Sequence, residues 1–206
     1  MKQLTIQDLP LEGIKAIVFD LDGTLYDNKY LPLRLIFGDI KNARLLASER
    51  NIRRMLKGLN FGNPDAFYNN MFEHIARRQN MPFMDARDWY FGKYMPLMIN
   101  VLKTHYHAGE FAEPLLKQLR GKGIVTAVFS DYRNVEDKLN ALGLDPDLFD
   151  YHFAAPDLGG LKPNKQLFLN ILKELGVDAQ QALMIGDRED TDGAGARNVG
   201  MKFLKV

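Results

Sequence analysis

The sequence contains no cysteine among its 206 residues. That absence excludes disulfides, thiolate metal sites and a cysteine nucleophile. The chain also lacks any run of about 20 apolar residues, the length that a helix needs to cross a membrane. Its first residues, MKQLTIQD, lack the continuous apolar stretch of a signal peptide. We therefore expect a cytoplasmic protein with no membrane partner.

An excess of charge of one sign is missing as well. The chain has 27 Lys and Arg against 26 Asp and Glu, a formal net charge of +1. Such a balance gives no overall attraction to nucleic acid, and no nucleic-acid partner is expected. Repeats and low-complexity linkers are also lacking, while a hydrophobic content of 46% is typical of a globular protein. Both a monomer and a homodimer are compatible with these features.

What the sequence does contain is an alternation of apolar strands and helices. A first strand is predicted over residues 14–19, and the alternation resumes after residue 111. The later strands are predicted at 123–130, 151–154, 182–186 and 202–206, and the helices at 113–120, 133–142, 165–175 and 191–199. This order predicts an α/β fold with a Rossmann-like, doubly wound parallel sheet.

A long helical segment interrupts this alternation. Residues 28–110 contain no convincing strand, and helical spacing of apolar residues appears over 43–59, 66–79 and 86–103. We therefore expect an α/β core formed by residues 1–27 and 111–206, with an inserted all-helical cap domain. Ligands of open parallel sheets bind at the carboxyl ends of the strands. An insertion directly after the first strand is therefore placed to cover such a site.

The motif Asp20-Leu21-Asp22-Gly23-Thr24 directly follows the first predicted strand. Residues two apart in an extended segment project to the same side, so Asp20 and Asp22 can face one substrate. Gly23 lets the chain turn steeply after the strand. One carboxylate can attack while the other moves a proton, which indicates phosphoryl transfer.

Three further motifs lie at the ends of later strands. Ser130 offers a hydroxyl that can hold a phosphoryl oxygen, and Lys162 a charge that can neutralise it. Asp187 begins an acidic cluster whose hard oxygen ligands suit Mg²⁺. Taken singly, these features are also typical of a helix cap, a solvated loop lysine and a helix N-terminus. Their occurrence together favours a functional site.

The four motifs, in this order, resemble those of the haloacid dehalogenase-like (HAD) hydrolase superfamily, in its aspartate-nucleophile phosphatase and phosphomutase branch. The resemblance covers residues 14–26 and 111–206. It implies a Mg²⁺-dependent phosphomonoester hydrolase that acts on a small phosphorylated metabolite through an aspartyl-phosphate intermediate. A phosphomutase of the β-phosphoglucomutase type is the alternative chemistry. From another class, a catalytically inactive phosphate-binding or interaction protein is the alternative function.

The resemblance also implies catalytic roles for matched residues. Asp20 would be the nucleophile, and an ordinary aspartate is already ionised at neutral pH, so no base is needed to activate it. Asp22 would protonate the leaving oxygen and later deprotonate water, which requires a pKa nearer neutrality. Ser130 and Lys162 would bind the transferring phosphoryl group. The residues expected to line the phosphate site are Gly23, Thr24, Ser130, Asp131 and Lys162.

Four acids would serve the metal in this scheme. Asp20, Asp187 and the backbone carbonyl of Asp22 would be ligands, and Asp192 would support the metal waters or Lys162 from behind. The dehalogenases that give the superfamily its name need no metal and lack the second acid of the first motif. Asp22 and Asp187 therefore argue for phosphate chemistry.

One departure from the family pattern concerns Asp131, which stands where asparagine is more usual beside the hydroxyl residue. A further carboxylate near an anionic substrate would repel it unless the side chain points away. We therefore favour the interpretation that Asp131 caps the helix that follows.

The helical segment is basic. Residues 28–111 carry 13 Lys and Arg against 7 Asp and Glu, a balance of +6, which leaves −5 for the rest of the chain. A basic cap above an acidic core would attract an anionic phosphoester. We interpret most of its basic residues as solvated helix faces, with at most one or two that contact substrate. The residues considered are Arg44, Arg50, Arg53, Arg54 and Lys57.

Overall fold

A single parallel sheet forms the centre of the protein in a computed structural model, which describes residues 3–206. The strands stand in the order β3-β2-β1-β4-β5. Their bounds are Ala16–Asp20 for β1, Val125–Ser130 for β2, Tyr151–Ala154 for β3, Ala182–Gly186 for β4 and Lys202–Lys205 for β5. All residues of the central strand β1 are buried, because β2 and β4 pair with it on either side.

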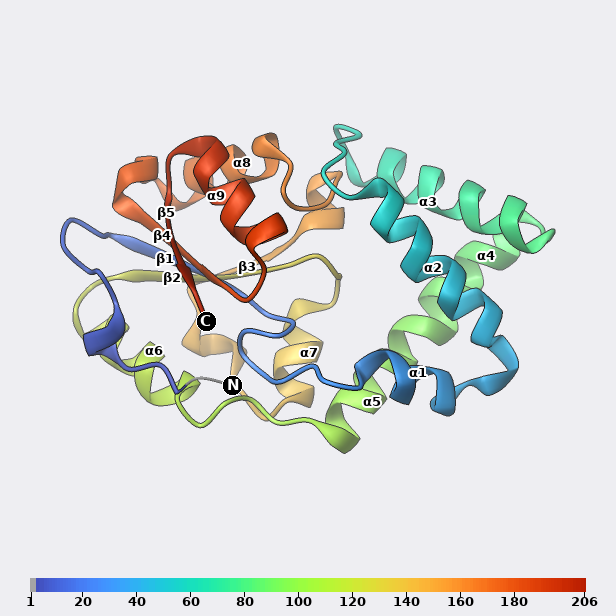
Figure 1. Cartoon of the computed structure of the whole chain (residues 1–206), viewed down its shortest axis with the longest axis horizontal. Coiled ribbons are helices and arrows are strands. Elements are labelled where there is room, and N and C mark those ends of the chain that lie inside the picture. The colour runs from blue at the N-terminus through green and yellow to red at the C-terminus, as the bar shows by residue number, and fades with distance from the viewer. Residues whose placement is uncertain (1–2) are drawn as a thin grey trace.

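Helices cover both faces of this sheet. Figure 1 shows α8 (Lys165–Leu175) and α9 (Ala194–Val199) above the strands, and α6 (Ala112–Gly121) and α7 (Val135–Ala141) below them. The buried residues of α8 lie three to four positions apart, which places one apolar stripe against the sheet. The predicted α/β fold with a doubly wound parallel sheet is confirmed.

The regular elements between residues 31 and 105 are helical and lie beside the sheet (Figure 1). They are α1 (Leu31–Gly38), α2 (Ala43–Leu56), α3 (Pro64–Gln79), α4 (Phe83–Trp89) and α5 (Met95–His105). The sequence predicted α2 and α3 but not the short α1. No helix in residues 3–206 has the length and apolar character that would let it cross a membrane. The division into a core and a cap domain at residues 28 and 110 stays a prediction.

The predicted helix over 86–103 is interrupted by a wider turn. Between α4 and α5, residues Tyr90–Tyr94 form a π-helical turn in which the Met95 amide donates to the Tyr90 carbonyl. Tyr90 and Tyr94 are buried in an aromatic cluster with Phe72, whereas Tyr30 and Phe37 near the start of the helical segment are exposed. The helical segment therefore has its own apolar core.

Two backbone hydrogen bonds tie the connection between α2 and α3 to the loop that follows β3. The Phe61 amide donates to the Gly159 carbonyl at 2.7 Å, and the Leu161 amide donates to the Leu59 carbonyl at 3.3 Å. A Cβ at Gly160 would lie 2.5 Å from the Leu59 carbonyl oxygen, so these two backbone segments can approach each other only because this residue is glycine. The hydrogen bonds fix the loop that carries Lys162 against the segment between α2 and α3.

Candidate active site

The four sequence motifs meet at one edge of the sheet. Asp20 ends β1, Ser130 ends β2, Lys162 lies in the connection between β3 and α8, and Asp187 follows β4. Because the strands are parallel, their carboxyl ends share that edge. Asp20, Lys162 and Asp187 line one cavity of about 280 Å³, together with Asp22. Ser130 lies behind it, fully buried.

Asp20 lies at the buried end of this cavity, with 5% of its surface exposed. Its Oδ1 accepts from Lys162 Nζ at 2.6 Å, and its Oδ2 accepts from Thr24 Oγ1 at 2.9 Å. Burial raises the pKa of Asp20 to about 8; Lys162 opposes this shift, while Asp192 and Asp22 add to it. The burial of Asp20 therefore disfavours its ionised form, in contrast to the ordinary aspartate expected from the sequence.

Lys162 is a fixed, buried cation between two acids. Its Nζ donates to Asp20 Oδ1, to Asp192 Oδ1 at 2.7 Å and to the Phe129 carbonyl at 3.2 Å. Burial alone would lower the pKa of Lys162, but Asp192 and Asp20 hold it well above its usual value. Asp192 thus contacts Lys162. Support of Lys162 is one of the two roles expected for Asp192 from the sequence.

Asp22 is held by three donors. Lys138 Nζ lies 2.6 Å from Oδ1 and 2.5 Å from Oδ2, the Tyr26 hydroxyl donates to Oδ1 at 2.6 Å, and Ser130 Oγ donates to Oδ2 at 3.0 Å. Burial raises the pKa of Asp22, but Lys138 and the hydrogen bonds outweigh it and keep the pKa below its ordinary value. The shift is opposite to the one that a proton donor at neutral pH requires, so in this arrangement Asp22 is an ionised proton acceptor.

Sequence reasoning missed Lys138. It lies on α7 and is fully buried, although a helix lysine is usually solvated. The signal was in the spacing: Val135, Lys138, Leu139 and Leu142 occupy positions i, i+3, i+4 and i+7, which is one helix face. A lysine on an apolar stripe indicates a buried acidic partner, because an unpaired charge there would be costly.

The interpretation of Asp131 as a helix cap is wrong. The N-cap position of α7 belongs to Asn134, and no side chain caps it. Asp131 Oδ1 instead accepts from the Lys162 amide at 2.9 Å, so it joins the end of β2 to the lysine loop. It also lines the cavity, and burial raises the pKa of its carboxyl.

Three acids can hold a metal ion. One oxygen each of Asp20, Asp187 and Asp192 lies within 4.8 Å of the others. Within residues 3–206, Asp187 Oδ1 is buried without a hydrogen-bond partner, and a Cβ at Gly23 would lie 2.5 Å from Asp187 Oδ2. An orphaned carboxylate oxygen in a clustered acid site fits a cation that prefers oxygen ligands. Asp192 joins this cluster, whereas the side chain of Asp22 points to Lys138.

The basic residues of α2 differ in their surroundings. Arg53 is buried; it binds Glu49 and donates to the Asp131 carbonyl at 2.7 Å, while its guanidinium lies 4.1 Å from the Tyr132 ring centroid. It therefore holds α2 on the segment after β2, and the interpretation as a solvated face is wrong for Arg53. Lys57 pairs with Asp190.

Comparison with known proteins points to one family. The family model described as haloacid dehalogenase-like hydrolase matches residues 14–200. Glyceraldehyde 3-phosphate phosphatase of Pyrococcus abyssi is 32% identical over 213 residues, which cover 93% of this chain and 80% of that protein. The 5-amino-6-(5-phospho-D-ribitylamino)uracil phosphatase of Escherichia coli is 27% identical over 94% of this chain and 83% of its own length.

Solved structures agree on the fold. The L-2-haloacid dehalogenase of Xanthobacter autotrophicus superposes with a TM-score of 0.64 over 94% of this chain and 77% of that chain, at 19% identity. Likeness at that identity shows a shared fold and carries no statement about the reaction. The family model that matches residues 14–200 and the relative that is 32% identical show the family as well as the fold. This chain belongs to the haloacid dehalogenase-like hydrolase family.

Proposed function

We propose that this protein is a Mg²⁺-dependent phosphomonoester hydrolase that works through an aspartyl-phosphate on Asp20. The observation that carries the proposal is the position of Asp20, which ends β1 inside a cavity, bound to Lys162 and beside the acids of the cluster. The names of the relatives, both phosphatases, support the same class of reaction. We also propose that residues 28–110 act as the cap over this cavity.

In the proposed first step, a carboxylate oxygen of Asp20 bonds to phosphorus as the bond from phosphorus to the alcohol oxygen breaks. In the second step, water attacks phosphorus, the Asp20–phosphorus bond breaks, and inorganic phosphate leaves. Lys162 neutralises charge at the nucleophile in both steps. Asp22, ionised as placed, accepts the proton of that water; donation to the leaving alcohol requires its carboxyl to leave Lys138 and take up a proton.

The acid cluster would bind the metal in this scheme. Asp20, Asp187 and Asp192, with the Asp22 carbonyl, would hold Mg²⁺, which would supply positive charge for the phosphoryl oxygens and stabilise the ionised form of Asp20.

A pH dependence of Mg²⁺ binding follows from the state of Asp20. With a pKa of about 8, its carboxyl is mostly protonated at pH 7 before Mg²⁺ binds, and it must lose that proton to bind Mg²⁺. We expect binding at pH 7 to release nearly one proton, and the apparent Kd to fall by about tenfold from pH 6 to pH 7 and to level off above the pKa. Calorimetry in buffers of different ionisation enthalpy measures both quantities. An affinity that stays constant between pH 6 and pH 8 would contradict the assignment.

A phosphoester screen tests the function directly. The purified protein would be incubated with Mg²⁺ and a panel that includes glyceraldehyde 3-phosphate, the substrate named for the archaeal relatives, and hexose phosphates. We expect release of inorganic phosphate that stops with EDTA and returns with Mg²⁺. No release from any ester, or undiminished turnover in EDTA, would refute the proposal. Isomerisation of a hexose phosphate in place of phosphate release would favour the phosphomutase alternative.

A further inference from the structure

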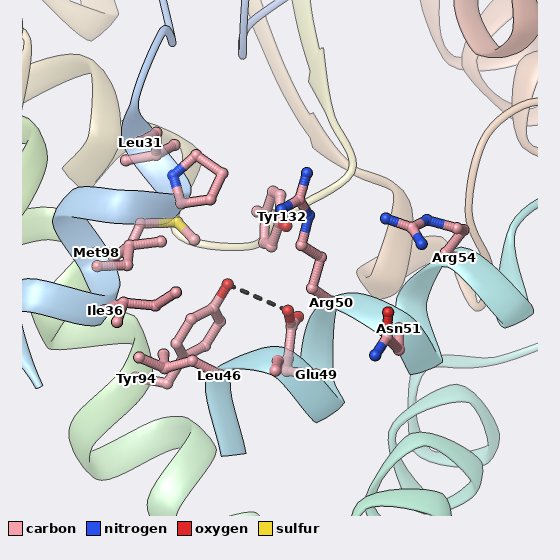
Figure 2. Close-up of a pocket in the computed structure, with 13 residues that line it drawn as sticks. Leu31, Ile36, Leu46, Glu49, Arg50, Asn51, Arg54, Tyr94, Met98 and Tyr132 are labelled. Atoms are coloured by element: carbon pink, nitrogen blue, oxygen red, sulfur yellow. Dashed lines mark hydrogen bonds between the residues drawn. The ribbon is translucent and has the colours of Figure 1, made fainter. Parts of the chain in front are cut away.

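A second cavity adjoins the catalytic one. It has a volume of about 230 Å³ and lies between α1, α2 and α5 of the helical segment (Figure 2). Leu31, Pro32, Arg50 and Tyr132 line both this cavity and the one that contains Asp20. We call it the cap cavity. Because the two share these residues, a phosphoester whose phosphoryl group lies at Asp20 has the cap cavity beside it.

One wall of the cap cavity is aliphatic. Figure 2 shows Leu31, Ile36, Leu46 and Met98 directed towards the same space; Leu31, Leu46 and Met98 are buried, and Ile36 packs against the core. The hydroxyl groups of a sugar that bound against such a wall would lose their hydrogen bonds to water and would gain none from the protein.

Two of the polar side chains that line the cap cavity, Tyr94 and Glu49, are engaged in hydrogen bonds, while Asn51 and Arg54 lie on its exposed side. The Tyr94 hydroxyl donates to Glu49 Oε2 at 3.2 Å, and Glu49 Oε1 accepts from Arg53 Nε at 2.8 Å. Tyr94 therefore presents its ring to the cavity. An apolar cavity of 150 Å³ is enough to take up benzene, so 230 Å³ accommodates a single ring or a short alkyl chain.

Arg50, Asn51 and Arg54 form the polar side of the cap cavity, and of these only Arg50 also lines the catalytic cavity. Across residues 3–206, Arg50 makes no hydrogen bond, ion pair or ring contact, whereas the other cations of the catalytic cavity are engaged: Lys162 with Asp20 and Asp192, and Arg188 with Asp190. Arg50 is exposed and lines the cavity that contains Asp20, so its guanidinium is available for the outer oxygens of a phosphoryl group.

We infer that the cap cavity binds the alcohol part of the substrate and that the preferred substrates are phosphomonoesters of apolar alcohols, with a short alkyl chain or one ring. Arg50 binds the phosphoryl end, and the aliphatic wall takes the body of the alcohol. This inference rests on the proposed phosphatase function and deepens it. It departs from the triose phosphate that the archaeal relatives are named for, because a triose body is polar.

Binding of alkylphosphonates tests the inference without turnover. Methyl-, butyl- and hexylphosphonate share one head group and differ only in apolar length. In calorimetry with Mg²⁺ present, we expect the Kd to fall at least about tenfold from methyl to hexyl, because each buried methylene adds to the affinity. A Kd that is flat or rises along the series, or no binding of hexylphosphonate at millimolar concentration, would overturn it.

Filling the cap cavity should remove this preference. Ile36→Trp places a ring in the cavity, and Leu33→Trp is the matched control, because Leu33 lies on the same helix but is 51% exposed and does not line the cavity. We expect Ile36→Trp, but not Leu33→Trp, to abolish the gain from methyl to hexyl. Ala47→Leu, at an exposed position of the cavity rim, gives a second filling variant with little risk to folding. A preference that survives both filling variants would overturn the location.

Arg50→Gln should act differently from the filling variants. If Arg50 binds the head group, its loss weakens all three phosphonates by about the same factor, about tenfold. Weakening confined to hexylphosphonate would overturn its assignment to the phosphoryl end.

Turnover separates this inference from the function on which it rests. Hydrolysis of short and long alkyl phosphates with equal kcat/KM would overturn the inference and leave the phosphatase intact. Tight, length-dependent binding of phosphonates without hydrolysis of any phosphomonoester would refute the proposed function and uphold the cavity assignment.

Discussion

Replacing Asp20 with Asn is expected to lower turnover by at least about 10⁴-fold, because removal of a covalent nucleophile leaves only binding and charge stabilisation. The fold should survive. The amide keeps the shape of the carboxyl, and Lys162 keeps its ion pair with Asp192 when that with Asp20 is lost. The burial that raises the pKa of Asp20 also means that a neutral side chain is well accommodated there.

Steady-state kinetics with the best ester from the screen, together with thermal unfolding, would measure both effects. Asp27→Asn is the matched control: it is the same change in the connection that follows β1, at an exposed carboxyl that accepts from the Lys29 amide. It should keep turnover close to that of the unchanged protein. Turnover retained in Asp20→Asn would refute the assignment of the nucleophile.

Replacing Lys138 with Met is expected to lower the free energy of unfolding by about 3–5 kcal/mol, because it leaves the charge of Asp22 without its partner in a buried site. Lys138 is fully buried, and both oxygens of Asp22 lie within 2.6 Å of its Nζ. Urea unfolding at pH 7 measures the change. Lys117→Met is the matched control, because Lys117 pairs with Glu113 at 2.7 Å on an exposed surface, where such pairs contribute little.

A double substitution identifies the cause. The double variant Lys138→Met, Asp22→Asn keeps neither charge. Its loss in free energy of unfolding should therefore be smaller than the sum of the losses in the two single variants. The same cycle separates charge from packing, since Met fills much of the volume of Lys. Additive losses would mean that Lys138 stabilises α7 by packing and not through Asp22.

The paired charge of Asp22 also adds acid sensitivity. Its folded pKa lies below the ordinary value, so its contribution to stability is present at neutral pH, where the carboxyl is ionised in both states. That contribution is lost as pH falls through the ordinary pKa of an aspartate towards the lowered one.

Much of the fold was readable because its signals are local. A parallel strand buried on both faces must be continuously apolar, which marks β1 and β4 in the sequence. The π turn at Tyr90–Tyr94 and the short helix α1 were not readable, because both depend on how the helical segment packs. The choice between one long helix and two joined by a wider turn is made by tertiary contacts.

The sequence by itself determined the family, the order of the four motifs and their meeting at one edge, because parallel strands bring their carboxyl ends together. Lys162 therefore meets Asp20 across 142 residues as the topology requires. The tertiary structure decided which donor each remaining acid faces. Lys138 holds Asp22, the Lys162 amide holds Asp131, and Arg50 stays free beside the cap cavity. Side-chain direction and burial set these partners and the pKa values that follow, and both exist only once the helices have packed on the sheet.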